Sequence, residues 1–151
     1  LGFLTDTVIK LVKDTGYPGM KILQFGFDSR EESDYLPHSY TKNTVVYTGT
    51  HDNDTTKHWF EVLDAEDKKM AVEYMNLRDD SEACREMIRM AYASVSDTCI
   101  IPMQDFLELG EEARINLPST LGKNWTWRMK SDACSDELAA RIADLVRIYK
   151  R

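Results

Sequence analysis

The sequence predicts an α/β fold in which short parallel strands alternate with helices. Three largely apolar runs are separated by stretches with helical periodicity. The runs lack the strict apolar and polar alternation of half-exposed strands, and their nearly continuous apolar character is typical of parallel strands covered on both faces. We therefore predict strands over residues 20–25, 44–48 and 98–103.

A helix is predicted ahead of the first strand. Thr5 or Asp6 is a suitable N-cap, and Gly16, followed by Pro18 and Gly19, ends the helical pattern. The predicted buried side of this helix carries Val8, Ile9, Leu11 and Val12.

Four more helices are predicted, three of them between the second and third strands. These cover residues 54–63, 66–76 and 81–94, and the last helix covers 135–149. The apolar faces of the 81–94 and 135–149 helices carry Cys84, Met87, Ile88 and Ala91, and Leu138, Ile142, Leu145 and Val146. Residues 28–43 and 110–130 remain as long loops, a length that usually accompanies function or mobility.

Composition narrows the function classes. The 151 residues carry a net charge of −7 with a pI near 5.0, which argues against nucleic-acid binding and against a basic membrane-surface helix. No apolar run approaches the roughly 20 residues of a membrane span. Three widely spaced cysteines indicate reduced thiols and a cytoplasmic location rather than a disulfide framework. Residues 1–151 form a single segment, with no repeat or linker.

The most informative stretch is residues 44–56, in which a β-favouring run leads into a turn of small residues. The turn places His51, Asp52, Asn53 and Asp54 just before a helical pattern. In α/β barrels, catalytic groups lie at this position, where a strand ends and a loop begins.

Each of these residues also has a purely structural interpretation. Asn53 or Asp54 would serve well as a turn former or helix cap, and we predict capping for Asp54. Asp105, at the end of the third strand, could cap a short helix. Trp125 and Trp127 could either stack on a ligand or pin the 110–130 loop.

Several runs, in this order and at this spacing, resemble the 4-α-glucanotransferases (amylomaltases, or disproportionating enzymes), retaining enzymes of the α-amylase-like clan. The runs are 18–25 (PGMKILQF), 35–38 (YLPH) with 43–56 (NTVVYTGTHDNDTT), 102–105 (PMQD) with 109–110 (LG), and 113–118 (ARINLP) with 122–128 (GKNWTWR). The resemblance extends from residue 1 to about residue 128. It implies the C-terminal portion of a (β/α)8 TIM barrel, about strands 6 to 8 with their helices, since a closed barrel needs roughly 250 residues.

The resemblance also implies an activity. The whole enzyme would transfer α-1,4-glucan segments to the 4-hydroxyl of an acceptor glucose or maltooligosaccharide by a retaining double displacement, with no metal and no cofactor. Asp52 matches the family aspartate that stabilises the transition state, because a fixed carboxylate holds a sugar hydroxyl more tightly as the ring becomes cationic. The implied substrate-binding residues are His51, Asn53, Gln104, Asn116 and Asn124.

The other two carboxylates of this mechanism are absent from the 151 residues. By resemblance, the acid/base glutamate would fall two positions before Leu1, and the nucleophile earlier still. We therefore predict that the isolated segment is inactive. Its predicted partners are the glucan, the upstream half of the barrel, or further copies paired through open strand edges, where an inner face around Ile22, Val46 and Ile100 would lack its covering layers.

Two alternatives of other classes remain open. His51, Asp52, Asp54 and His58 could form the divalent-metal site of a His-Asp hydrolase, although such adjacent pairs usually lie on helices rather than after a strand. Alternatively, the segment could be a non-catalytic module that binds glucan through its Trp-rich loop.

Overall fold

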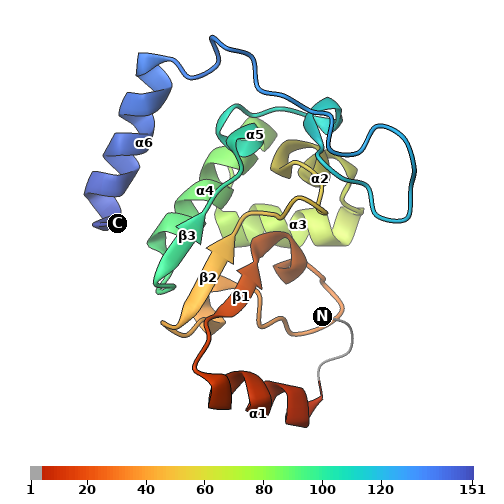
Figure 1. Cartoon of the computed structure of the whole chain (residues 1–151), viewed down its shortest axis with the longest axis vertical. Helices are drawn as coiled ribbons and strands as arrows, with labels where there is room; N and C mark the ends of the chain where they lie inside the picture. Colours follow the sequence, from red (N-terminus) through yellow and green to blue (C-terminus); the bar gives the residue numbers. More distant parts are fainter. Residues whose placement is uncertain (1–4) are drawn as a thin grey trace.

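The structure is a computed structural model in which residues 5–151 are described. The described chain has strands with helices before, between and after them (Figure 1). The strands are β1 (Gly19–Ile22), β2 (Thr44–Tyr47) and β3 (Thr98–Ile100). The helices are α1 (Asp6–Thr15), α2 (Thr56–Val62), α3 (Ala65–Met75), α4 (Ala83–Ala93), α5 (Met103–Phe106) and α6 (Asp136–Tyr149).

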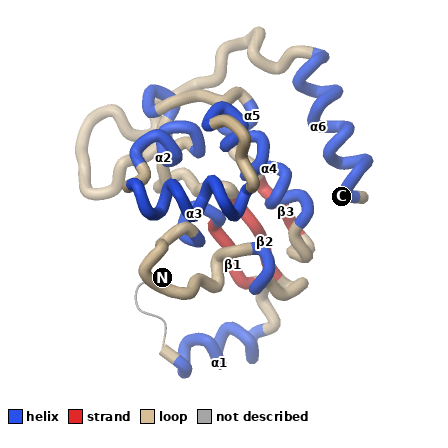
Figure 2. Tube along the Cα trace, turned by 180° about the vertical axis from the view of Figure 1, so that it is seen from behind, coloured by secondary structure: helices blue, strands red, loops and turns tan. Residues whose placement is uncertain are grey.

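The three strands form one parallel sheet in the order β1-β2-β3. This arrangement confirms the predicted α/β class with parallel strands. Helices α2, α3 and α4 cover one face of the sheet, as Figures 1 and 2 show from opposite sides. The opposite face is covered only in part: Ile22 is 4% exposed there, whereas Met20 and Ile100 are 54% and 47% exposed. All three strands end at the same edge of the sheet, where the chain continues into β2–α2 and β3–α5 connections.

The main core lies between the sheet and the covering helices. Val46 from β2, Phe60 from α2, Met75 from α3 and Met87 from α4 are all at most 3% exposed and belong to one apolar cluster. A second, smaller cluster joins Ile88, Phe106 and Leu138, and so attaches α5 and α6 to α4. The site at the strand ends therefore rests on a packed two-layer support.

The prediction that Val46 shares one face of the sheet with Ile22 and Ile100 is wrong. The register aligns Ile22, Tyr47 and Ile100 on one face, and Lys21, Val46 and Cys99 on the other. Because side chains alternate along a strand, a one-residue difference places Val46 against the helices while Ile22 and Ile100 point to the opposite face.

The helices begin and end close to their predicted bounds because the sequence supplies the caps. The Thr5 hydroxyl accepts a hydrogen bond from the Val8 N–H, and Gly16 takes the left-handed conformation after α1, with φ of 69°. Ser135 caps α6 in the same way. The predicted burial of one side of α1 is wrong within the described residues: Ile9 and Leu11 are 42% and 61% exposed, since α1 stands apart from the sheet (Figure 1).

Two strands end earlier than predicted. The first strand ends at Ile22, and Leu23–Gly26 forms a short 3₁₀ turn. The third ends at Ile100, since Pro102 has no N–H for a sheet ladder and instead precedes the first turn of α5. The long loops contain two further 3₁₀ turns, η2 (Pro37–Ser39) and η4 (Glu111–Ala113).

Self-association of the isolated segment stays a prediction. Met20 and Ile100 are exposed on the side of the sheet away from the helices, and the outer edges of β1 and β3 carry no further strand among the described residues. We expect the isolated 151 residues to form oligomers or a dye-binding, partly ordered species. Light scattering after size exclusion tests this, and a monomer with a sharp cooperative melting transition would contradict it.

Candidate active site

A tight turn after β2 presents the candidate catalytic pair. The backbone N–H and the hydroxyl of Thr50 both donate to the Asn53 side-chain oxygen, at 3.0 and 2.8 Å, and close the turn around His51 and Asp52. Gly49 lies just before it and leaves room for Gln24, because a Cβ there would lie 2.7 Å from Nε2 of Gln24 and would displace that side chain. The turn leaves the His51 and Asp52 side chains about half exposed, at 52% and 51%.

Asp52 is held from one side only. Its Oδ1 accepts a hydrogen bond from Asn116 Nδ2 at 2.6 Å and lies 3.3 Å from His51 Nε2. The His51 ring in turn lies against the Trp125 ring, with 4.9 Å between centroids. No hydrogen bond or ion pair from residues 5–151 reaches the second oxygen, Oδ2. Asp52 therefore offers one anchored and one available carboxylate oxygen at the surface.

The segment that follows α5 is bound to this turn by one backbone hydrogen bond and by the Arg114 side chain, and a further backbone bond holds the segment itself together. Asn116 N–H donates to the His51 carbonyl at 3.1 Å, and Trp125 N–H donates to the Ile115 carbonyl at 2.7 Å. The Arg114 guanidinium donates to the Asp52 carbonyl at 2.8 Å and to the Asp54 carboxylate at 3.1 Å. Two segments more than 60 residues apart in sequence thus form one surface.

Asp54 is an ion-pair residue rather than the predicted helix cap. The N-cap of α2 is Thr55, whose hydroxyl accepts from the His58 N–H. Asp54 is only 14% exposed, and its Oδ2 contacts both His58 Nδ1, at 2.7 Å, and Arg114. The hydrogen bond that the His58 ring donates to the Asp54 carboxylate raises the pKa of His58 above its ordinary value, although partial burial opposes this effect. The Asp54 carboxylate is thus bound by the His58 imidazole and the Arg114 guanidinium, and the cap of α2 is the next residue, Thr55.

Asp105 lies beneath the site and joins three elements. It is 2% exposed and accepts hydrogen bonds from the Thr48 hydroxyl, the Thr56 N–H and the Thr56 hydroxyl. Burial raises the pKa of the Asp105 carboxyl, and these three donors lower it, with burial the larger effect. The side chain thus ties α5 to the end of β2 and the start of α2, rather than capping its own short helix.

Replacing Asp105 is expected to weaken the fold. Asp105→Ala leaves buried donors without a partner and should cost about 3 kcal/mol. Asp105→Asn should cost less, since both threonine hydroxyls can turn to accept from the amide. Because the folded pKa is raised, protonation favours the fold, so the wild-type protein should lose stability relative to Asp105→Asn as pH rises above about 4. Melting temperatures of both full-length proteins from pH 4 to 7 test this, and parallel curves would contradict it.

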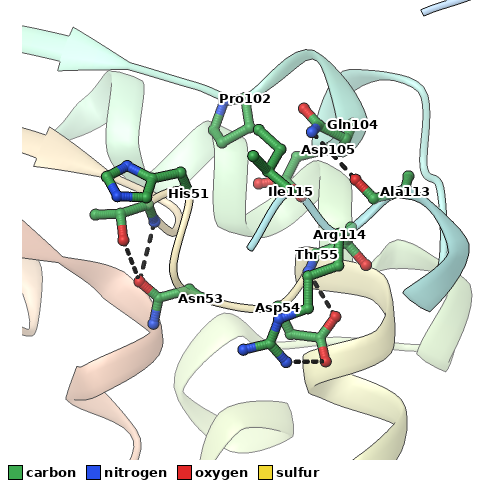
Figure 3. A pocket seen from close by; sticks show the side chains of 11 residues that line it. His51, Asn53, Asp54, Thr55, Pro102, Gln104, Asp105, Ala113, Arg114 and Ile115 are labelled. Atoms are coloured by element: carbon green, nitrogen blue, oxygen red, sulfur yellow. Dashed lines mark hydrogen bonds and ion pairs between the residues drawn. The ribbon is translucent and has the colours of Figure 1, made fainter. Parts of the chain in front are cut away.

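The remaining predicted site residues lie nearby but in structural roles. Figure 3 shows a pocket lined by His51 and Asn53 on the β2–α2 connection and by Gln104 on α5; Asn124 is not among its lining residues. Gln104 is 5% exposed and donates to the Ala113 carbonyl at 3.2 Å. Asn124 accepts from the Leu117 N–H at 2.9 Å and organises the loop around itself. Contact of Asn53, Gln104 or Asn124 with substrate stays a prediction.

The sequence analysis did not predict that Asp54 binds both Arg114 and His58. A partial signal existed: Arg114 lies two residues before Asn116 in a run that also carries the family resemblance. The pairing partner is 60 residues away, and spacing along the chain gives no indication of such a contact.

Two other sequence-based expectations meet the structure here. Among residues 5–151, no group of three or more His, Cys, Asp or Glu side chains is arranged to hold a metal ion, so the hydrolase alternative gains no support. Within the same residues, no helix has the length and apolar character needed to cross a membrane. Cys84, Cys99 and Cys134 are free thiols.

Comparison of the sequence with known proteins gives one family. Residues 1–134 match the family described as 4-alpha-glucanotransferase. The whole chain is 52% identical to a 4-alpha-glucanotransferase of Clostridium butyricum and 48% identical to one of Streptococcus pneumoniae, and covers 31% and 30% of those proteins.

A solved structure agrees. The amylomaltase of Streptococcus agalactiae in complex with acarbose superimposes with a TM-score of 0.94 at 40% identity, over 100% of this chain and 31% of that one. The chain thus spans about a third of the length of the relatives it matches. The chain belongs to the 4-alpha-glucanotransferase family.

Proposed function

We propose that the chain is the C-terminal part of the catalytic barrel of a cytoplasmic 4-α-glucanotransferase and contributes about strands 6 to 8. The complete enzyme would move α-1,4-glucan segments from a donor to the 4-hydroxyl of an acceptor glucose or maltooligosaccharide. The family match over residues 1–134 supports the activity, and the parallel order β1-β2-β3 is compatible with three consecutive barrel strands.

The observation that carries the proposal is the state of Asp52. It follows a parallel strand, stands half exposed, and has one oxygen fixed by Asn116 and His51 while the other has no hydrogen-bond partner among residues 5–151. A carboxylate fixed in this way can accept a hydrogen bond from a sugar hydroxyl without rearranging. The bond strengthens as positive charge develops on the ring, so it stabilises the transition state more than the ground state.

The neighbouring residues fit supporting roles in this reaction. His51 packs against the tilted Trp125 ring and would orient the same sugar, while the Asn116 amide holds Asp52. We infer that the nucleophile and the acid/base belong to the two thirds of the enzyme outside this chain. The acidic character of the chain is compatible with a neutral substrate.

Incubation of the full-length enzyme with maltotriose tests the proposal. Transfer of a maltosyl unit between two maltotriose molecules gives glucose and maltopentaose, and NMR should show that the new linkage keeps the α configuration. Release of glucose and maltose without longer products would show a hydrolase instead. Loss of activity on adding a metal chelator would favour the metal-site alternative.

A further inference from the structure

The hydrogen bond between Asn116 and Asp52 joins a partly buried side chain to an exposed one, and such a bond holds a fixed geometry only if both backbones are fixed. The Asp52 side chain is 51% exposed and could adopt other rotamers. What fixes both backbones is therefore as important for the site as the bond itself.

Arg114 contacts both backbones at once. Nη2 donates to the Asp52 carbonyl at 2.8 Å, and Nε donates to the Asn116 carbonyl at 3.0 Å. The third nitrogen, Nη1, donates to the Asp54 carboxylate at 3.1 Å, and that carboxylate is also held by His58. Each nitrogen of the guanidinium thus has its own acceptor, and the planar fork sets their relative positions.

The loop beyond Arg114 is held in a conformation that local preferences disfavour. Trp125 has a φ of 65°, in the left-handed region that bulky residues rarely adopt. Its N–H bonds to the Ile115 carbonyl, and its ring lies against His51. Contacts with the β2–α2 turn therefore outweigh the local cost and keep this loop in place.

We propose that Arg114 is a positioning residue for the transfer reaction, which sets the orientation of Asp52 by fixing the backbones of Asp52 and Asn116 against the buried Asp54. This inference rests on the proposed role of Asp52. Arg114 touches no reacting group and acts only by holding Asp52 in place.

Arg114→Lys in the full-length enzyme is the direct test. Lysine keeps the positive charge but cannot reach three acceptors at fixed angles, so kcat for maltotriose should fall about 30-fold while KM changes by less than about threefold. Arg147→Lys is the matched control, because Arg147 is exposed on α6 and pairs only with Asp144 among the described residues. The control should keep its activity.

A double-mutant cycle distinguishes positioning from a merely structural role. If Arg114 acts through Asp52, Arg114→Lys should cost less than about threefold further in the Asp52→Asn background. Losses that multiply, or a kcat for Arg114→Lys within threefold of the wild type, would overturn the inference. Full activity of Asp52→Asn with a reduced Arg114→Lys would instead refute the proposed function.

Should Arg114→Lys fail to fold, Asp54→Asn provides the second variant. It keeps the side-chain shape and both carbonyl contacts of Arg114 but removes the anchoring charge. We expect a kcat about threefold to tenfold lower, and again little further loss in the Asp52→Asn background. Unchanged kcat, or losses that multiply, would refute the positioning role.

Discussion

Asp52→Asn in the full-length enzyme is expected to lower kcat for maltotriose by about 100-fold or more, with little change in KM. The amide keeps the shape of the side chain and can still contact Asn116. It loses the negative charge that meets the developing positive charge on the sugar ring, and this loss is felt in the transition state more than in the ground state.

Steady-state kinetics with a folding control decide the role of Asp52. Because the side chain is half exposed, the melting temperature should change little, and a normal melting curve would exclude unfolding as the cause. Asp144→Asn, an exposed acid on α6, is the matched control and should keep full activity. A kcat for Asp52→Asn near that of the wild type would reduce Asp52 to a turn residue.

His51→Ala should cost less than Asp52→Asn. His51 contributes its contact with Asp52 and its packing against Trp125, and its removal affects orientation rather than charge. A larger loss for His51→Ala than for Asp52→Asn would mean that the imidazole, and not the carboxylate, is the main group of this turn.

Local sequence signals predicted the fold well where residues close together in sequence set the backbone conformation. The caps at Thr5 and Ser135 and the apolar runs at β1 and β2 are local features, and the structure has them. The facing of Val46 was predicted wrongly, because a nearly continuous apolar strand carries no alternation to indicate which side meets the helices. Only the register of the sheet decides it.

The site was predictable up to the point where long-range contacts begin. The strand followed by His51 and Asp52 was visible in the sequence, and the family resemblance implied Asn116 as a substrate-binding residue but not its contact with Asp52. The role of Asp54 was not visible, since a helix cap and an ion-pair residue have the same local signature of an acid before Thr55-Thr56. What decides between them is Arg114, which approaches from another loop.

The isolated 151 residues are expected to show no disproportionation of maltotriose. A retaining transfer needs a nucleophile, an acid/base and a stabilising carboxylate, and we assign only the third of these to this chain. The relatives that it matches are about three times its length, which leaves room for the other two. Asp52 and His51 could stabilise charge on a sugar ring only while a nucleophile and an acid/base cleave the glycosidic bond, and we assign neither of those groups to this chain.

Binding measurements on the same isolated segment separate the remaining alternative. A glucan-binding module must bind maltooligosaccharide without its upstream partner, whereas half of an active site offers contacts to one side of the sugar only. Titration calorimetry with maltoheptaose should therefore give no measurable heat of binding at millimolar ligand. Tight binding without turnover would favour the module, and turnover above a vector control would place a complete catalytic set within these 151 residues.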